Sequence, residues 1–505
     1  MTKGIVAAGH QATAAAAAEI LGAGGNAFDA AIAGLFAACV AEPVLASPGG
    51  GGFLMGYDPA GGGDVLYDFF VDTPRSKRAS EETQFFGVEV DFGPAKQEFH
   101  IGLGAAATPG FVPGLFAVHR AHGSMAMADL VRPAIKSANE GVIVSAFQAY
   151  LFSIVAPIYA HHADSAKIFA PGGVPLREGE ILRNPYLAET LALLAAQGEI
   201  LFRDGEVGRE IIRQSAQNGG HLDAHDLLDY EVECRPPLVT RHNGAELVLN
   251  PAPAASGALI AFSLKLLENL VGQRPSTITE LAHVMAAAND ARRTHASAPA
   301  SLQDGDIIAA HLAELSNRAR AYRGTTHISV VDAEGRAAAS TVSNGEGNGY
   351  LVGPYGFMLN NMLGEEDLNP DGFGLWTPGQ RMSSMMAPTI IRTADGRLIA
   401  LGSGGSNRIR TAVLQVAINT IDHGMPLADA VVAPRLHVEK CGTASYEEQF
   451  GAKAISALLG EFPDAKGWPE PNMFFGGVHA VAMASDGVMV GTGDPRRAGV
   501  VIEVE

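Results

Sequence analysis

Cysteine and basic residues are scarce in this sequence. The 505 residues include three cysteines, Cys39, Cys234 and Cys441, which lie far apart and form no CxxC pair. This spacing indicates neither a disulfide framework nor a zinc site, so we expect no bound metal or cofactor and a reducing, cytoplasmic setting. Lys and Arg together number 35 against 54 Asp and Glu, which gives a formal net charge of -19. That balance argues against a nucleic-acid partner, because phosphate contacts require clustered cations.

Long hydrophobic runs and a secretion signal are also missing. The start of the chain, Met1 to His10, has neither the basic nor the apolar segment of a signal peptide. The most apolar run, Ala30 to Val40, is too short to span a bilayer and is typical of a buried helix. We therefore expect no membrane partner.

Several common catalytic signatures are absent. The sequence contains no HExxH and no GxSxG. Gly22 to Ala27 matches the GxGxxA dinucleotide fingerprint, but the helix-patterned stretch Gln11 to Leu21 precedes it where the fingerprint requires a strand. The run Gly49 to Gly52 lacks the Lys-Ser/Thr of a phosphate loop. It instead predicts close backbone packing or a loop that lines a cleft.

The chain does have a large fraction of apolar residues, and the spacing of these residues changes after the middle of the chain. Hydrophobic residues make up 47% and charged residues 18%, which suffices for a large core in one module or in two or three domains. Helical spacing predominates before Gly324, and alternating spacing begins at Thr325. The charged stretch Leu302 to Arg323 predicts a flexible or processed connection between the two patterns.

Three hairpins are predicted after Thr325, each from a glycine-containing turn between two alternating segments. A helix is predicted from Arg408 to His423. The paired segments are Thr326 to Asp332 with Arg336 to Ser343, Thr389 to Thr393 with Leu398 to Gly402, and Val478 to Ala484 with Val488 to Gly493. This order indicates an α+β protein in which helices cover a sheet.

The pair Gly324-Thr325 has the residue types needed for one particular chemistry. A Thr hydroxyl becomes a nucleophile when a base lies beside it, and that base can be its own α-amino group, exposed by cleavage of the preceding bond. Gly324 has no Cβ, so the Thr325 hydroxyl can approach the Gly324 carbonyl for an N-to-O acyl shift. Taken alone, however, these residues are more typical of a loop that leads into an edge strand.

Nine segments, in one order along nearly the whole chain, change this interpretation. They are Gly25 to Ala31, Gly49 to Phe53, Asp223 to Tyr230, Pro251 to Gly257, Thr325 to His327, Leu359 to Met362, Ser383 to Met385, Gly402 to Ser406 and Ala433 to Arg435. Together they resemble the γ-glutamyltransferase (glutathione hydrolase) family of N-terminal-nucleophile hydrolases.

The resemblance implies a four-layer αββα fold, formed as a precursor that cuts itself at Gly324-Thr325. Residues 1–324 would form the large subunit and residues 325–505 the small subunit of one αββα module. The processed protein would be a heterodimer of these two fragments. Whether such heterodimers associate into a higher oligomer stays open. A small-molecule amide would be the substrate, and water or an amine would accept the acyl group.

The resemblance also implies a role for each matching residue of the catalytic centre. Thr325 would be the nucleophile, and Ser343 would supply the second hydroxyl that bonds to it, with Ser in place of the family's Thr. Gly405 and Ser406 fall on the two adjacent glycines whose N–H groups form the oxyanion hole. Ser406 can serve there if its backbone adopts the angles of the glycine that it replaces.

The matching residues for substrate binding depart from the family pattern. Ser383 and Ser384 keep the pair of serines that assists in binding the substrate α-carboxylate. Phe70, however, occupies the position of the Arg that binds this carboxylate, and a bidentate Arg–carboxylate pair is not easily replaced. Arg75 lies five residues farther on as a possible substitute.

The positions that would hold the substrate α-amino group are also altered. Gly345 and Met362 stand where the family has an Asn and a Gln or Glu, and Glu365 retains the acid with one more methylene. Phe70 and Met362 together suggest a less polar acyl pocket, although both residue types are equally typical of ordinary core packing.

Three functions remain open from the sequence. The first is a self-processing γ-glutamyltransferase-type amidohydrolase. The second is an amidase for another acyl group, such as an N-acyl compound or a small dicarboxylic monoamide. The third is a non-catalytic binding protein that keeps the fold.

The proposed cleavage site yields a direct prediction. The wild-type chain should separate into two bands of unequal size on a denaturing gel, and mass spectrometry should find Thr325 as a free N-terminus. Thr325→Ala removes the attacking hydroxyl and should leave one intact chain. A wild-type chain that stays whole after prolonged incubation would contradict the prediction.

Overall fold

The computed structural model describes residues 2–61, 63–91, 96–272, 274–294, 302, 324–369, 372–439 and 442–505. Most of the predicted connection from Leu302 to Arg323, and Cys441, lie outside these residues. Of the two cysteines within them, Cys39 is buried and Cys234 is exposed. No described helix is long and apolar enough to cross a membrane.

The first of two large sheets holds the segment that follows Gly324. Its seven described strands are antiparallel to their neighbours. Their order is β20 (Val500–Val504), β1 (Gly4–Ala8), β11 (Thr326–Asp332), β12 (Ala337–Ser343), β2 (Gly51–Asp58), β3 (Gly63–Phe69) and β8 (Glu233–Arg235). The first strand that follows the predicted cleavage site therefore lies inside a sheet built mainly from residues that precede it.

The second large sheet is also antiparallel. The order of its six described strands is β19 (Met489–Thr492), β18 (Gly477–Met483), β14 (Leu398–Gly404), β13 (Thr389–Arg392), β10 (Ala245–Leu249) and β9 (Leu238–His242). It packs on the first sheet through contacts of β14 with β11 and β12 and of β18 with β11.

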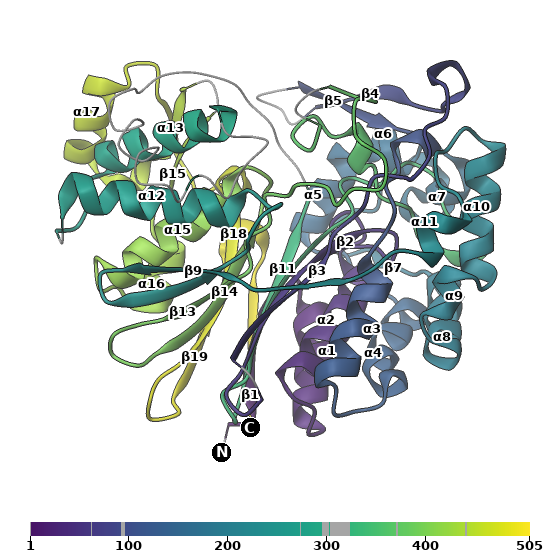
Figure 1. The fold of residues 1–505 in the computed structure, drawn as a ribbon, viewed down its shortest axis with the longest axis horizontal. Coiled ribbons are helices and arrows are strands. Elements are labelled where there is room, and N and C mark those ends of the chain that lie inside the picture. Colours follow the sequence, from purple (N-terminus) through teal and green to yellow (C-terminus); the bar gives the residue numbers. More distant parts are fainter. Residues whose placement is uncertain are drawn as a thin grey trace.

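Helices cover the outer face of each sheet, so the molecule has four layers (Figure 1). The first sheet is covered by α1 (Gln11–Gly22), α2 (Ala27–Ala41), α3 (Phe111–His122), α4 (Met127–Glu140) and α8 (Pro185–Gln197). The second is covered by α12 (Ser256–Val271), α13 (Ile278–Thr294), α15 (Arg408–Ile421), α16 (Leu427–Val432) and α17 (Ala452–Glu461). This arrangement confirms the predicted αββα fold.

β11 and β12 are buried along their full length because both faces of the hairpin are covered. The helix α2 packs on one face of β11, and β14 and β18 pack on the other. This explains why α2, which is buried at every position, has apolar residues on all sides.

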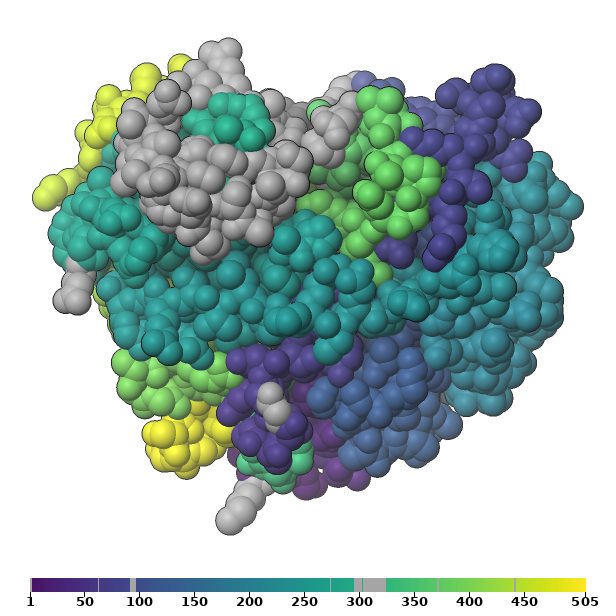
Figure 2. All heavy atoms as spheres, in the orientation of Figure 1, coloured from purple at the N-terminus to yellow at the C-terminus, as the bar shows by residue number. Residues whose placement is uncertain are grey.

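A third, smaller core lies beside the first sheet. It is formed by a hairpin and three helices, β4 (Phe86–Asp91), β5 (Lys96–Ile101), α5 (Ala146–Ile154), α6 (Ala156–Tyr159) and α7 (Ala163–Phe169). The remaining helices and strands are α9 (Ile200–Arg203), α10 (Glu206–Gln217), α11 (Ala224–Leu228), β6 (Val142–Ile143), β7 (Ile181–Leu182), β15 (Leu436–Val438), β16 (Ala444–Glu447) and β17 (Lys466–Trp468). The segment between α11 and β9 joins the two halves of the molecule and lies on the surface within a teal band in Figure 2.

The three predicted hairpins and the helix between them are all present, with ends that differ by a few residues. The strands β1 and β20, which pair with each other, were not predicted. β1 is the short segment Gly-Ile-Val-Ala-Ala, whose small residues show no clear alternation. It becomes a central strand only because β11 and β20 lie on either side of it.

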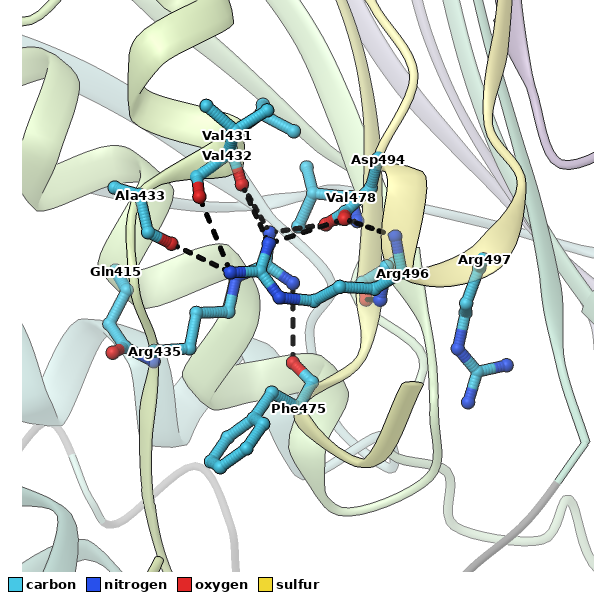
Figure 3. Close-up of polar contacts among 12 residues, drawn as sticks. Gln415, Val431, Val432, Ala433, Arg435, Phe475, Val478, Asp494, Arg496 and Arg497 are labelled. Carbon is cyan, nitrogen blue, oxygen red and sulfur yellow. Dashed lines mark hydrogen bonds and ion pairs between the residues drawn. The ribbon is translucent and has the colours of Figure 1, made fainter. Parts of the chain in front are cut away.

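A buried ionic network fastens the C-terminal segment to the second sheet and to α16 (Figure 3). Asp494 accepts hydrogen bonds from Arg435 Nη2 at 2.5 Å and from the Val478 N–H at 3.0 Å. Arg496 contacts Asp494 at 3.2 Å and Glu447 at 2.5 Å. Burial raises the pKa of Asp494, but Arg435 and Arg496 outweigh it and hold this pKa below its ordinary value.

Removal of the Asp494 charge should destabilise the protein strongly. In a Thr325→Ala background, which keeps one chain, Asp494→Asn should lower the free energy of unfolding by about 3–5 kcal/mol because two buried guanidinium groups lose their shared partner. Urea denaturation measures this change. Because folding lowers the pKa of Asp494, the Thr325→Ala parent should lose this stabilisation as the pH falls below about 4, and the Asp494→Asn variant should not.

Asp395→Asn is a matched control. Asp395 pairs with Arg397 at 2.9 Å, but its side chain is 60% exposed. An exposed ion pair contributes less than about 1 kcal/mol. Equal effects of the two substitutions would contradict the proposed role of the buried network.

Candidate active site

The Gly324–Thr325 bond lies at the open end of the β11–β12 hairpin. The strand register pairs Thr326 with Val342, so Thr325 and Ser343 are the next residues at the same end. Gly324, Thr325 and Ser343 are all buried. The hairpin thus brings the predicted nucleophile and the predicted second hydroxyl together, although a whole hairpin separates them along the chain.

Hydrogen bonds hold both main-chain polar groups of Gly324. Ser343 Oγ donates to the Gly324 carbonyl oxygen at 2.7 Å, and the Gly324 N–H donates to Glu346 Oε1 at 3.0 Å. The Ser343 hydroxyl in turn accepts the Gly345 N–H at 3.0 Å. A donor on the carbonyl oxygen polarises the carbon that the Thr325 hydroxyl would attack.

Two glycines determine where Ser343 lies. A Cβ on Gly50 would stand 2.4 Å from the Ser343 carbonyl oxygen, so the predicted close backbone packing of the polyglycine run is confirmed. Gly345 has φ +59°, and a Cβ there would stand 2.1 Å from Asn361 Oδ1 and 2.3 Å from Glu365 Oε1. Gly345 therefore acts through its left-handed turn and its N–H group, and a side chain at this position would displace Asn361 and Glu365.

The turn between β14 and α15 lies directly against Thr325. A Cβ on Gly404 would stand 2.1 Å from the Thr325 carbonyl oxygen. Gly405 has φ +120° and Ser406 has φ +54°, so Ser406 adopts a left-handed backbone that non-glycine residues seldom take. Among the described residues, the N–H groups of Gly405 and Ser406 have no hydrogen-bond acceptor. Donors at the N-terminal end of α15 are suited to an oxyanion.

Asp367 secures this turn and was not identified from the sequence. Its Oδ2 accepts hydrogen bonds from Asn407 Nδ2 at 2.6 Å and from Ser406 Oγ at 3.4 Å. Arg292 Nη1 donates to Asn407 Oδ1 at 2.7 Å, which links the turn to α13. The left-handed backbone of Ser406 is thus stabilised by two hydrogen bonds to Asp367, one from the Ser406 side chain and one from the side chain of Asn407.

A cavity with an open volume of about 360 Å³ lies beside Thr325, and we name it the acyl cavity. Its lining residues are Phe70, Gly324, Thr325, Ser343, Met362, Glu365, Asp367, Leu368, Ser384, Met385, Met386, Ser406 and Ile409. Most of the predicted site residues meet in this lining. Ser383 does not, because it is exposed, so only one serine of the predicted pair reaches the cavity.

The wall of the acyl cavity is largely apolar. Phe70 is buried and stacks on Phe53 with ring centroids 5.6 Å apart, and Met362 is also buried. Among the described lining residues there is no Lys or Arg. Arg75 does not substitute for the missing cation, because it is half-exposed and faces Asp229 at 4.0 Å. Glu365 and Asp367 give the cavity a negative side.

Two lining residues, Met386 and Ile409, had no signal in the sequence. They look like ordinary core residues, and only tertiary packing brings them to the cavity beside Thr325. Asn344 directly follows Ser343 in the chain. It is buried, and neither polar atom of its side chain has a described partner.

The buried side chain of Glu42 contacts the first residue of β11. Glu42 accepts hydrogen bonds from Thr326 Oγ1 at 2.7 Å and from Thr13 Oγ1 at 2.6 Å. Burial raises the pKa of Glu42, and the two hydroxyl donors and Arg497 oppose this rise incompletely. The contact with Glu42 orients Thr326 away from the acyl cavity, so among the described lining residues Thr325 alone presents a Thr side chain there.

Comparison with known proteins identifies relatives along the whole chain. The family model described as gamma-glutamyltranspeptidase matches residues 13–504. The acylase ACY 1 proenzyme of Pseudomonas sp. (strain V22) is 30% identical over 532 aligned residues, which cover 100% of this chain and 94% of the relative. The glutathione hydrolase proenzyme of Escherichia coli (strain K12) is 28% identical over 538 residues, which cover 98% of this chain and 90% of the relative.

Solved structures show the same fold. The cephalosporin acylase from Bacillus halodurans superposes with a TM-score of 0.83 at 22% identity, over 99% of this chain and 96% of that one. The gamma-glutamyltranspeptidase of Helicobacter pylori superposes with a TM-score of 0.52 at 27% identity, over 60% of this chain and 89% of that one.

The hydrogen bond from Ser343 to the Gly324 carbonyl generates a prediction about processing. Ser343→Ala should slow cleavage by about ten- to a hundredfold, because a hydrogen bond to developing charge contributes about 1.5–3 kcal/mol. Ser343→Thr keeps the hydroxyl and should retain most of the rate. Intact-mass measurements after a pulse of cell-free synthesis follow the reaction.

Ser340→Ala is the matched control for strand β12. Ser340 Oγ donates to the Phe53 carbonyl at 2.9 Å, so this substitution also removes a buried hydrogen bond, but one remote from Gly324. It should leave the cleavage rate near that of the wild type. Cleavage of Ser343→Ala at the wild-type rate would show that the hydroxyl has no role in processing.

Proposed function

The chain belongs to the gamma-glutamyltranspeptidase family, and we propose that it is a self-processing amide hydrolase with Thr325 as its N-terminal nucleophile. The observation that carries the proposal is the hydrogen bond from Ser343 Oγ to the Gly324 carbonyl oxygen, at the bond that must be cut. The relatives named as proenzymes support cleavage into two subunits.

In the processing step, the Thr325 hydroxyl oxygen attacks the Gly324 carbonyl carbon. The new C–O bond forms as the C–N bond breaks, and the hydroxyl proton passes to the released α-amine. Water then hydrolyses the resulting ester, which leaves a carboxylate on Gly324 and restores the Thr325 hydroxyl. Ser343 and the N–H groups of Gly405 and Ser406 are the donors available to the developing oxyanion.

The same groups would act on an external amide. The free α-amine of Thr325 takes the proton from its own hydroxyl, whose oxygen attacks the substrate carbonyl, and the proton then passes to the leaving amine. Water or an accepting amine resolves the acyl ester on Thr325. The buried, largely apolar cavity restricts the access of water to the reacting atoms.

The acyl cavity supports a preference for acyl groups without a carboxylate. Its described lining has no cation, and Glu365 and Asp367 would repel a substrate carboxylate. Phe70 and Met362 offer apolar contacts to the acyl chain. A simple acyl amide, or one that carries an amino group toward Glu365, fits these features better than γ-glutamate or a dicarboxylic monoamide.

The γ-glutamyl group is the second candidate. Glu365 and Ser384 stand at positions that would bind its α-amino and α-carboxylate groups, and both line the cavity. A binding protein without catalysis is disfavoured, because Ser343 Oγ bonds the Gly324 carbonyl oxygen and the Gly405–Ser406 turn lies beside Thr325.

Four p-nitroanilides separate these candidates. Their acyl groups share one four-carbon chain and differ in whether it carries an amino group, a carboxylate, both or neither. They carry butanoyl, 4-aminobutanoyl, glutaryl and γ-glutamyl groups. We expect kcat/KM to be about tenfold or more higher for the two groups that lack a carboxylate, because burial of an unpaired carboxylate costs more than about 1.4 kcal/mol.

The Thr325→Ala variant is the control that lacks the nucleophile. It should release p-nitroaniline no faster than the uncatalysed background reaction. Faster turnover of γ-glutamyl than of 4-aminobutanoyl would overturn the proposed acyl preference but not the hydrolase. Failure of the processed wild type on a broad acyl panel would overturn the hydrolase itself.

A further inference from the structure

A cavity away from Thr325 lies where α13, α15, the end of α16 and the segment before α17 meet. It has an open volume of about 690 Å³, and we name it the α15 cavity. Ile409 of the acyl cavity and Ile418 of this cavity both belong to α15, about 13 Å apart along its axis. The lining residues are Ser276, Thr277, Ile278, Leu281, Gln415, Ile418, Asn419, His423, Met425, Ala433, Pro434, Gln449 and Phe450, and none of them lines the acyl cavity.

Two lining residues belong to a segment that matches the family but that the active site does not use. Ala433 and Pro434 line the α15 cavity, and Arg435, the third residue of this segment, binds Asp494 in the buried ionic network. The same network holds the Ala433 carbonyl oxygen, which accepts a hydrogen bond from Arg496 Nη2 at 2.9 Å. This wall of the cavity is therefore fixed by buried contacts on its far side.

Gln415 in α15 supplies a polar but satisfied part of the lining. It is buried, its Nε2 donates to the Leu436 carbonyl oxygen at 2.9 Å, and its Oε1 accepts the Leu436 N–H at 2.8 Å. A second hydrogen bond from Nε2 goes to the Thr411 carbonyl oxygen at 2.7 Å. Gln415 therefore holds α15 in place and needs no ligand of its own.

A buried imidazolium fixes the loop between α15 and α16, which carries His423 and Met425. His242 contacts Asp422 at 2.9 Å and Glu268 at 3.2 Å, each through a different ring nitrogen. Carboxylates only accept hydrogen bonds, so both nitrogens carry protons. Burial lowers the pKa of His242, but Asp422 and Glu268 outweigh it and raise this pKa above its ordinary value.

The walls of the α15 cavity are thus formed before any ligand binds. The Met425 N–H also donates to the Asn419 carbonyl oxygen at 2.9 Å, which closes the loop onto the end of α15. A preformed cavity loses little conformational entropy on binding, and its open volume lies in the range of small-molecule sites.

The chemistry of the lining selects an uncharged ligand. Among its described residues there is no Lys, Arg, Asp or Glu, so a charged ligand would lose its hydration without a counter-charge. Met425 and Phe450 offer the thioether and aromatic contacts that suit an aromatic ring. Asn419 Oδ1 and the Ser276 hydroxyl have no hydrogen-bond partner among the described residues, so they can bond to a polar group on that ring.

We propose that the α15 cavity is a ligand site separate from the active site and that it binds an uncharged aromatic carboxamide. The ring lies against the apolar lining, and the amide N–H donates to Asn419 Oδ1. The site is remote from Thr325, so its occupation does not depend on the proposed hydrolase.

Three probes of one shape test the proposal: 2-naphthamide is uncharged, 2-naphthoate is an anion and 2-naphthylmethylammonium is a cation. The full-length Thr325→Ala chain cannot hydrolyse the amide and is labelled with methyl-¹³C methionine. The Met425 signal, assigned by its loss in Met425→Leu, should shift when 2-naphthamide is added. The two charged probes should bind about tenfold or more weakly, because the cavity would leave their charges unpaired.

The methionines of the acyl cavity are an internal control. Met385 and Met386 line that cavity, so their signals report binding there in the same spectrum. Ala433→Phe, at a half-buried position, should fill the α15 cavity and abolish the Met425 shift. Leu368→Trp, at a half-buried position of the acyl cavity, should leave that shift unchanged. Asn419→Leu keeps the size of the side chain but removes the acceptor, and should weaken the binding of 2-naphthamide about fivefold.

The Met425 signal decides the result. A Met425 signal that none of the probes moves, or equal affinities for the three probes, would overturn the proposed site. Shifts confined to Met385 and Met386 would assign 2-naphthamide to the acyl cavity and would also overturn it. So would a Met425 shift that persists in Ala433→Phe, or an unchanged affinity in Asn419→Leu. The p-nitroanilide rates test the hydrolase separately.

Discussion

The hydrogen bond between Ser343 and the Gly324 carbonyl depends on the register of the β11–β12 hairpin. Thr326 pairs with Val342, which places the two hydroxyl residues at the same end of the hairpin. A slip of one residue would turn every side chain of one strand to the opposite face and would remove Ser343 from the carbonyl. The packing of α2 on one face and the second sheet on the other prevents such a slip, because both faces of the hairpin are buried.

The two cavities that Gly324 lines differ in charge. The acyl cavity contains Glu365 and Asp367 and has no described cation, whereas the second cavity, which Gly405 also lines, contains Glu346, Arg408 and Arg497. Gly405 and Ser406, in the β14–α15 turn, have N–H groups with no hydrogen-bond acceptor among the described residues. An asymmetric site of this kind can discriminate the two halves of an amide independently, because each half meets a different field.

The structural roles of individual residues differ from what residue type alone suggests. Gly345, where the resemblance implied a position for substrate binding, forms a left-handed turn and donates its N–H to Ser343. Ser406 replaces a glycine and still adopts a left-handed backbone, with its hydroxyl against Asp367. At both positions the backbone conformation, and not the residue type alone, determines what the residue contacts.

Local patterns in the sequence determined the hairpins after Thr325, the helices α1, α2 and α15, and, through the family motifs, the predicted nucleophile and the four-layer fold. These features depend on turn residues, periodicity and contiguous motifs, which are all local. Only the tertiary structure decided that β1 is a central strand, that Ser384 but not Ser383 reaches the acyl cavity, and that Arg497 lies beside Gly405 with no carboxylate partner among the described residues. Their positions depend on contacts between residues distant in the sequence, and the packing of the two sheets, which no local pattern encodes, creates those contacts.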